Sequence, residues 1–147
     1  TSDVANLKHC GVVANVTIIP HGVPAMDAIS IASKTKPASS VIATYGFCLR
    51  HKGLPEILAG FAKAFSDGDN THLWMVNAIY SPQESDALIL ELKAQIRNLR
   101  LEDRVTLVND YLSEEESLAY LTTADLIVFP YQHTTESSSA AVRMGIA

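Results

Sequence analysis

Two places in this sequence combine residue types that could bind an anion. Lys52 precedes Gly53 and Pro55, and a proline so placed favours the first turn of a helix. Glu136 opens a run of three serines, residues 137–139, that leads into an alanine-rich apolar segment. The first turn of a helix presents free backbone N–H groups and the positive end of the helix dipole, and a lysine adds a point charge. Both places therefore suit a phosphate, although an ordinary loop closed by a serine cap would contain the same residue types.

These residues need secondary structure to position them, and the hydrophobic pattern predicts alternating strands and helices. Short apolar, β-branched runs predict strands over residues 16–20, 41–45, 72–79, 104–108 and 125–129. Apolar residues at helical spacing and capping signals predict helices over residues 3–9 and from about residues 54, 82, 114 and 137. Ser81 and Ser113 each precede a glutamate by three residues, which is the pattern of a capping box. Residues 25–40 show no period and are predicted to form a long loop.

This alternation predicts an α/β fold, a Rossmann-like parallel sheet with helices on both faces. In such a sheet ligands bind outside the carboxyl ends of the strands. The loops that follow the predicted strands contain His21, Arg50, Lys52 and Glu136. We therefore expect these four side chains to lie at one edge of the sheet.

Composition narrows the class of protein. The chain has 147 residues, enough for one domain with a core, and its net charge of −5 argues against a nucleic-acid partner. Cys10 and Cys48 form neither a metal-ligand spacing nor a disulfide framework. No apolar run is long enough to span a membrane, so we expect a cytoplasmic location, with attachment to a membrane surface as the alternative for a full-length protein. The glutamates at 114–116 are predicted to form a solvated first helical turn rather than a metal site.

Three common signatures are missing from the sequence. No G-x-G-x-x-G follows a predicted strand, and no G-x-x-x-x-G-K-[ST] is present. There is also no G-x-S-x-G, the motif of a nucleophile elbow. The sequence therefore argues against a dinucleotide dehydrogenase, a P-loop NTPase and a hydrolase of the elbow type.

Four segments, taken in order, resemble a known family. They are residues 18–23 (IIPHGV), 46–53 (GFCLRHKG), 101–108 (LEDRVTLV) and 124–136 (ADLIVFPYQHTTE). Together they resemble the carboxyl-terminal domain of group 1, or family 4, glycosyltransferases of the GT-B fold, over almost the whole chain from about Val16. The resemblance implies that residues 1–147 are one nucleotide-sugar-binding domain, truncated at its carboxyl end and separated from an amino-terminal acceptor domain. A fragment of this kind would transfer no sugar by itself.

The resemblance also implies a donor site. The donor would be a nucleoside diphosphate sugar with uridine, guanosine or adenosine, and its sugar would be transferred with retention of configuration and without a metal or other cofactor. Glu136 matches the first glutamate of the family's E-x7-E motif and is the candidate catalytic residue. The other candidates would bind the donor, and they are Lys52, Arg50, Gly46, His21, Gly22, Ser137, Ser138 and Ser139. The acceptor, a sugar, lipid or protein, would be bound mainly by the missing domain.

The chain departs from the family pattern at several positions. Phe47 stands where the family has a phosphate-binding arginine, for which Arg50 is a possible substitute. No second glutamate of E-x7-E is present at or near residues 142–144, and Tyr131 follows Pro130 where the family has a serine. These departures keep two alternatives open, a non-catalytic module that binds a nucleotide or a protein, and a nucleotide-sugar epimerase of the same fold.

Overall fold

The computed structural model describes residues 2–19, 22–23, 34–65, 68–132 and 139–147. Within these residues the sheet has four strands in the order β3-β2-β1-β4, all parallel to their neighbours. The strands are β1 (Ser40–Phe47), β2 (Thr71–Ala78), β3 (Val105–Val108) and β4 (Leu126–Ile127). The helices are α1 (Ser2–His9), η1 (Arg50–Lys52, a 3-10 turn), α2 (Leu54–Ala64), α3 (Pro82–Asn98), α4 (Glu114–Thr123) and α5 (Ala140–Ile146). The predicted α/β parallel sheet is confirmed.

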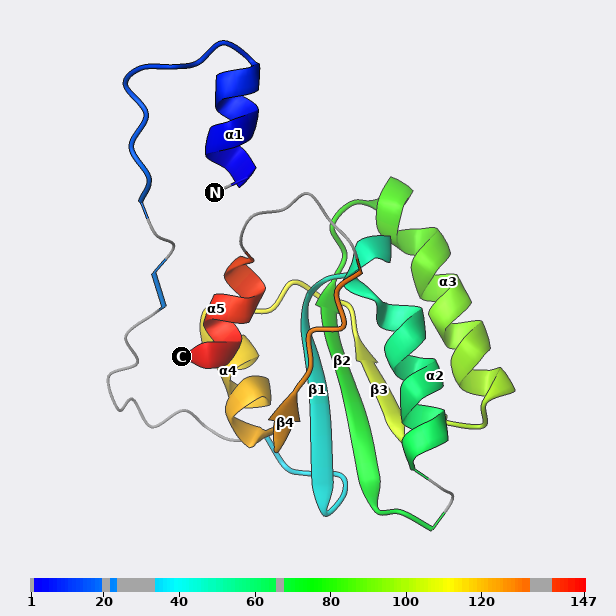
Figure 1. The fold of residues 1–147 in the computed structure, drawn as a ribbon. Coiled ribbons are helices and arrows are strands. Elements are labelled where there is room, and N and C mark those ends of the chain that lie inside the picture. The colour runs from blue at the N-terminus through cyan, green and yellow to red at the C-terminus, as the bar shows by residue number, and fades with distance from the viewer. Residues whose placement is uncertain (1, 20–21, 24–33, 66–67, 133–138) are drawn as a thin grey trace.

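Helices cover both faces of this sheet, as predicted, with α2 and α3 on one face and α4 and α5 on the other (Figure 1). Side chains of a strand alternate between the faces, so β2 contributes to two cores. Leu73 and Met75 pack with the apolar stripe of α2 and α3, where Leu58 and Leu92 are fully buried. Trp74 packs on the opposite face of the sheet, with its ring edge-on to the ring of Tyr120 on α4.

Capping side chains and glycine set the helix starts that face the carboxyl edge of the sheet. Ser113 accepts a hydrogen bond from the backbone N–H of Glu116, and the Glu116 carboxylate accepts from the Ser113 N–H, a complete capping box. At Ser81 the side chain accepts from the backbone of the residue three positions on, which is half of the predicted box. Gly53 separates η1 from α2 with φ 70°, in the left-handed region that glycine adopts without steric cost.

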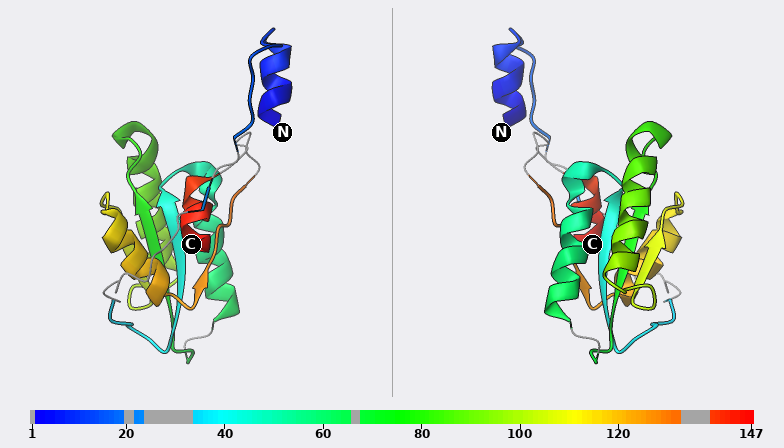
Figure 2. Two further views of the ribbon diagram at one scale, coloured as in Figure 1. Left: turned by 90° about the vertical axis from the view of Figure 1, so that its left-hand side faces the viewer. Right: turned by 90° about the vertical axis from the view of Figure 1, so that its right-hand side faces the viewer.

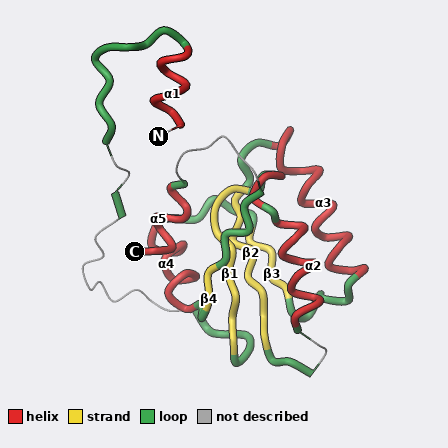
Figure 3. The backbone as a smooth tube through the Cα atoms, viewed as in Figure 1, coloured by secondary structure: helices red, strands yellow, loops and turns green. Residues whose placement is uncertain are grey.

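The predicted strand at residues 16–20 is wrong for the residues that are described. Val16 and Ile19 lie in an irregular segment, drawn as loop in Figure 3, and Ile19 is 83% exposed. A β-branched apolar run favours a strand, but a strand also needs a partner with free backbone groups. Among the described residues no strand pairs with this segment, and the views in Figure 2 place the neighbouring helix α1 apart from the sheet.

Predicted boundaries also move, most clearly at three elements. β1 continues through Gly46 to Phe47, because its ladder with β2 extends to Ala78. β4 is limited to Leu126–Ile127, where it pairs with β1, so the prediction of residues 125–129 is too long. The last helix begins at Ala140 rather than at Ser137, and residues 133–138 lie outside the described part of the chain.

Candidate functional site

The carboxyl ends of β1 and β2 open into a cavity of about 590 Å³. Its floor contains the last residues of these strands, including Tyr45 and Val76. One wall is the β3–α4 loop with the start of α4, and the opposite wall is the start of α5. The cavity therefore lies at the carboxyl edge of the strands, where a doubly wound sheet binds its ligand. This is the edge at which the sequence predicted a ligand site.

Lys52 is the predicted binding residue with the clearest place in this cavity. It ends η1, directly after β1, and it lines the cavity although the whole residue is only 6% exposed. Its ammonium lies 4.1 Å from the centre of the Tyr131 ring, the distance of a cation–π contact. A buried ammonium beside an aromatic face carries a strong local charge, because little water screens it.

Gly46 of β1 and Ser139, just before α5, also line the cavity. Gly46 has φ 131°, and a Cβ at this position would lie 3.2 Å from the Cβ of Ala141. Glycine thus allows β1 and α5 to approach closely. Ser139 is the N-cap residue of α5, but its side chain makes no capping hydrogen bond and instead lies 2.9 Å from the Tyr131 hydroxyl.

The structure places the other predicted residues elsewhere or does not describe them. Arg50 forms a two-point ion pair with Glu91 of α3, with nitrogen–oxygen distances of 2.9 and 2.6 Å, and it is not among the residues lining the cavity. This pairing, an exposed one, raises the pKa of the guanidinium through the Glu91 hydrogen bond. Gly22 is exposed and away from the cavity lining. His21, Glu136, Ser137 and Ser138 lie outside the described residues.

Several lining residues were not predicted from the sequence. Asp110, Glu114 and Ser117 place two carboxylates and a buried hydroxyl on the α4 wall. Met144 faces the cavity from α5, eight residues after Glu136, where the family's second glutamate would stand. The sequence did contain a signal for Glu114. A carboxylate in the first turn of a helix that follows a strand lies close to any ligand at the carboxyl edge of the sheet.

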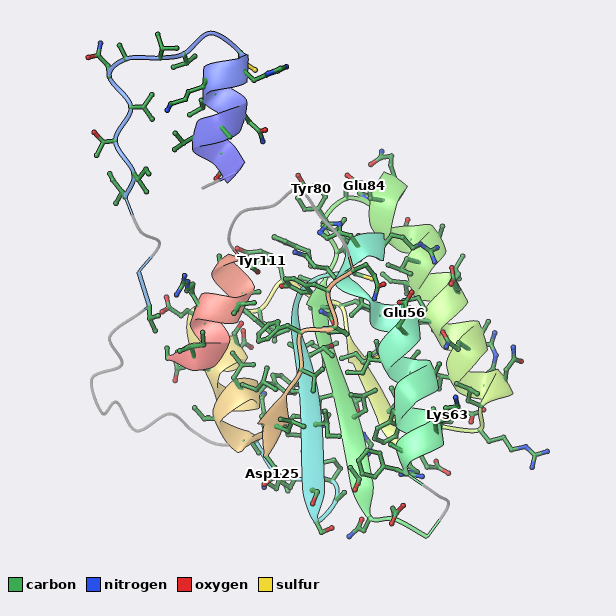
Figure 4. All side chains as sticks on the ribbon, in the orientation of Figure 1. Glu56, Lys63, Tyr80, Glu84, Tyr111 and Asp125 are labelled. Carbon is green, nitrogen blue, oxygen red and sulfur yellow. The ribbon has the colours of Figure 1, made fainter. Side chains whose placement is uncertain are left out.

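Three aromatic side chains cluster at the carboxyl edge of the sheet, and two of them, Phe47 and Tyr111, line the cavity. Phe47 packs edge-on against Tyr80 at 5.3 Å and in a stacked arrangement against Tyr111 at 6.4 Å, both measured between ring centroids. Figure 4 shows Tyr80 and Tyr111 at the carboxyl edge of the sheet, while Asp125 lies at the opposite edge. Phe47 and Tyr111 both line the cavity, so planar or apolar groups of a ligand would meet rings at its entrance.

Cys48 lies next to this edge but is not a candidate nucleophile. The residue is fully buried, its backbone carbonyl accepts a hydrogen bond from Ser85, and burial raises the pKa of its thiol to about 11. A thiol with this pKa stays protonated at neutral pH, and the thiolate is the reactive form. The described residues also contain no group of three or more histidine, cysteine, aspartate or glutamate side chains that could hold a metal ion. Over the same residues, no helix is long and apolar enough to cross a membrane.

Comparison with known proteins identifies the fold. No protein-family model matches the chain, and no curated protein matches its sequence. Among solved structures, sucrose-phosphate synthase from Thermosynechococcus elongatus matches with a TM-score of 0.63 and 21% sequence identity, over 97% of this chain and 36% of that chain. The carboxyl-terminal domain of a glycosyl transferase group 1 family protein from Francisella tularensis matches with a TM-score of 0.57 and 13% identity, over 68% of this chain and 56% of that chain.

The structural matches agree with the resemblance that the sequence motifs predicted. The fold of this chain is that of the carboxyl-terminal domain of a GT-B glycosyltransferase. The chain spans about a third of the length of the matched synthase and just over half of the matched domain. At these identities the likeness concerns the fold, so substrate and activity depend on the site itself.

Proposed function

We propose that this chain is the donor-binding domain of a retaining glycosyltransferase. The observation that carries the proposal is the meeting of Lys52 and Ser139 in a cavity at the carboxyl edge of the sheet. A lysine and the first backbone N–H groups of a helix are suited to the oxygens of a diphosphate, and they can neutralise part of its charge without a metal ion. The likeness in fold to a glycosyl transferase domain supports this choice of ligand.

The rest of the cavity has the chemistry that a nucleoside diphosphate sugar would need. Asp110 and Glu114 offer carboxylate oxygens, which accept hydrogen bonds from ribose or sugar hydroxyl groups. Ser117 adds a hydroxyl on the same wall, and Tyr111 offers an aromatic face for a planar base. The ligand would thus lie with its phosphates beside Lys52 and its hydroxyl-rich part against α4.

Sugar transfer itself would belong to a longer protein. Glu136 would hold the transferred sugar through its hydroxyl groups, and the backbone of Ser137 and Ser138 would contact phosphate, in a segment that the structure does not describe. The acceptor, a sugar, lipid or protein, would be bound mainly by a second domain, with the reaction in the cleft between the two. The proposed setting is the cytoplasm, with no nucleic acid, metal or cofactor taking part.

A second candidate is a module of this fold that binds a nucleotide but transfers nothing. Phe47 stands at the position of the family's arginine, Arg50 is engaged with Glu91, and Met144 stands where a second carboxylate would be. The cation of the described lining is therefore Lys52, and the same lining includes the carboxylates of Asp110 and Glu114, which favours weak rather than tight binding of a diphosphate. An epimerase that uses the same donor is the remaining alternative.

Titration calorimetry with UDP, GDP and ADP tests the proposed ligand. We expect the chain to bind at least one of them weakly, and Lys52→Gln to lower the affinity by about 10- to 100-fold, the value of a charge-assisted hydrogen bond to phosphate. Lys63→Gln is the matched control, because Lys63 is exposed and lies near the end of α2 remote from the carboxyl edge (Figure 4). Unchanged affinity in both variants would refute the phosphate role of Lys52.

An assay of the full-length protein separates the candidate functions. Transfer of a sugar from the bound donor to an acceptor, with retained configuration, supports the transferase. Interconversion of donor sugars without an acceptor indicates the epimerase, and nucleotide binding without either reaction indicates the non-catalytic module.

A further inference from the structure

The segment from Pro130 to Gln132 packs directly on the turn that carries Lys52, although the two are far apart in the sequence. The backbone N–H of Gln132 donates a hydrogen bond of 2.8 Å to the carbonyl of His51. A Cβ added to Gly53 would lie 1.9 Å from the carbonyl oxygen of Pro130, so the two backbones are in van der Waals contact. This contact fixes the position of the intervening residue, Tyr131, against the turn.

Tyr131 contacts two residues of the cavity at the same time. Its ring faces the Lys52 ammonium at 4.1 Å, and its hydroxyl lies 2.9 Å from the hydroxyl of Ser139. The ring of Phe129 stands edge-on to it at 5.8 Å and limits its rotation. Lys52 and Ser139 both line the cavity, whereas the residues that line it do not include Tyr131.

We propose that Tyr131 is a positioning residue for the anion site, which holds Lys52 and the start of α5 at a fixed separation. The proposal rests on the proposed function, since it assigns a task within the same diphosphate site. A lysine has a flexible four-carbon stem, and each contact that restricts it in advance lowers the entropy cost of binding a ligand. The aromatic face attracts the ammonium and restricts it before the ligand arrives. The Tyr131 hydroxyl restricts Ser139, the N-cap residue of α5, in the same way.

Two substitutions separate the contacts that Tyr131 makes. Tyr131→Phe keeps the aromatic face under Lys52 and removes the hydrogen bond to Ser139. Tyr131→Leu removes both contacts and keeps a side chain of moderate size. Because Ser139→Ala removes the same hydrogen bond from its other end, Tyr131→Phe and Ser139→Ala should have equal effects, and the double variant should add nothing further.

The experiment compares the affinity for a nucleoside diphosphate with the affinity for the matching nucleoside, each titrated into the parent chain and the variants. We expect Tyr131→Leu to weaken binding of the tightest of UDP, GDP and ADP by about 3- to 30-fold, the range that corresponds to one cation–π contact. Binding of the matching nucleoside, which has no phosphate, should change by less than about twofold. Tyr131→Phe should retain most of the diphosphate affinity. Tyr80→Leu is the control, since this tyrosine is 56% exposed at the same edge, does not line the cavity and touches Phe47 rather than Lys52.

Three results would overturn the inference. If Tyr131→Leu binds the diphosphate as tightly as the parent, Tyr131 does not position the site. If the variant loses diphosphate and nucleoside affinity equally, its role is general packing rather than placement of Lys52. If the parent binds no diphosphate at all, the proposed function fails together with the inference, whereas the first two results leave the proposed function intact.

Discussion

Replacement of Gly53 by alanine is predicted to destabilise the protein because two independent penalties meet at this residue. Gly53 has φ 70° and ψ 29°, and a side chain in the left-handed region costs about 1–2 kcal/mol. The added Cβ would also lie 1.9 Å from the carbonyl oxygen of Pro130 and 2.9 Å from its carbonyl carbon. The Pro130 segment must therefore move, which removes the hydrogen bond from Gln132 to His51, worth about 0.5–1.5 kcal/mol.

Together these penalties predict a loss of about 1.5–3.5 kcal/mol in the free energy of unfolding. In a domain of this size that loss lowers the midpoint of thermal unfolding by about 3–14 °C. Displacement of Pro130 would also carry Tyr131 away from Lys52, so Gly53→Ala should weaken diphosphate binding as well. Urea and thermal unfolding followed by circular dichroism measure the first effect, and calorimetry measures the second.

Gly60→Ala is the matched control, because the same change inside α2, rather than just before it, should have the opposite sign. Gly60 lies within α2, and a Cβ there would meet no atom within 4 Å. Alanine in an exposed helix interior is favoured over glycine by about 0.5–1 kcal/mol. If Gly53→Ala were as stable as the parent, or if both variants moved in the same direction, the close contact between the two backbones would be wrong.

Three further predictions concern stability. The pKa of Asp125 is lowered first by the Lys36 hydrogen bond of 2.6 Å, so Asp125 stabilises the fold above the ordinary aspartate pKa range and loses this effect as the pH falls below it. Asp125→Asn should therefore reduce the loss of stability at low pH, as measured by urea unfolding at pH 7, 5 and 3. His72 has its pKa lowered by burial and then by Arg104, so the unfolded chain takes up a proton first and stability should fall as the pH drops below about 6.5. His72→Gln should remove this decrease in the free energy of unfolding between pH 7 and 5. Equal pH dependence of stability in the parent and the variant would contradict the prediction. Ser113→Ala should cost about 1 kcal/mol through loss of the capping box, and Ser113→Asp should recover most of it by the same measurement.

The local pattern of the sequence was sufficient for the central elements. Residues 41–45 were predicted as a strand and lie in β1, and the predicted strand 72–79 coincides with β2 except at Ile79, because apolar runs of strand length bounded by turn residues favour strands. The starts of α3 and α4 were predicted from Ser81 and Ser113, since a capping side chain acts on backbone groups only three residues away. The order of these elements then predicts a parallel sheet with a ligand edge.

The same local reasoning was insufficient where a partner decides the outcome. The apolar run at Val16 has the composition of a strand, but no described strand pairs with it. The sequence also did not indicate that Arg50, which stays a candidate for phosphate binding, would pair with Glu91 of α3. Periodicity records which residues favour burial or pairing, and it carries no information on which distant residue is within reach.

The sequence by itself therefore determined the α/β class, the capped helix starts and the position of Lys52 at the end of a strand, all of which depend on interactions within a few residues. Tertiary structure decided what surrounds Lys52. Tyr131 comes from the far end of the chain, and its ring reaches Lys52 because β4 pairs with β1 and the Pro130 backbone fits against Gly53. Ser139 joins this arrangement through the Tyr131 hydroxyl. Contacts of this kind depend on the packing of whole elements, so no short stretch of the sequence could have indicated them.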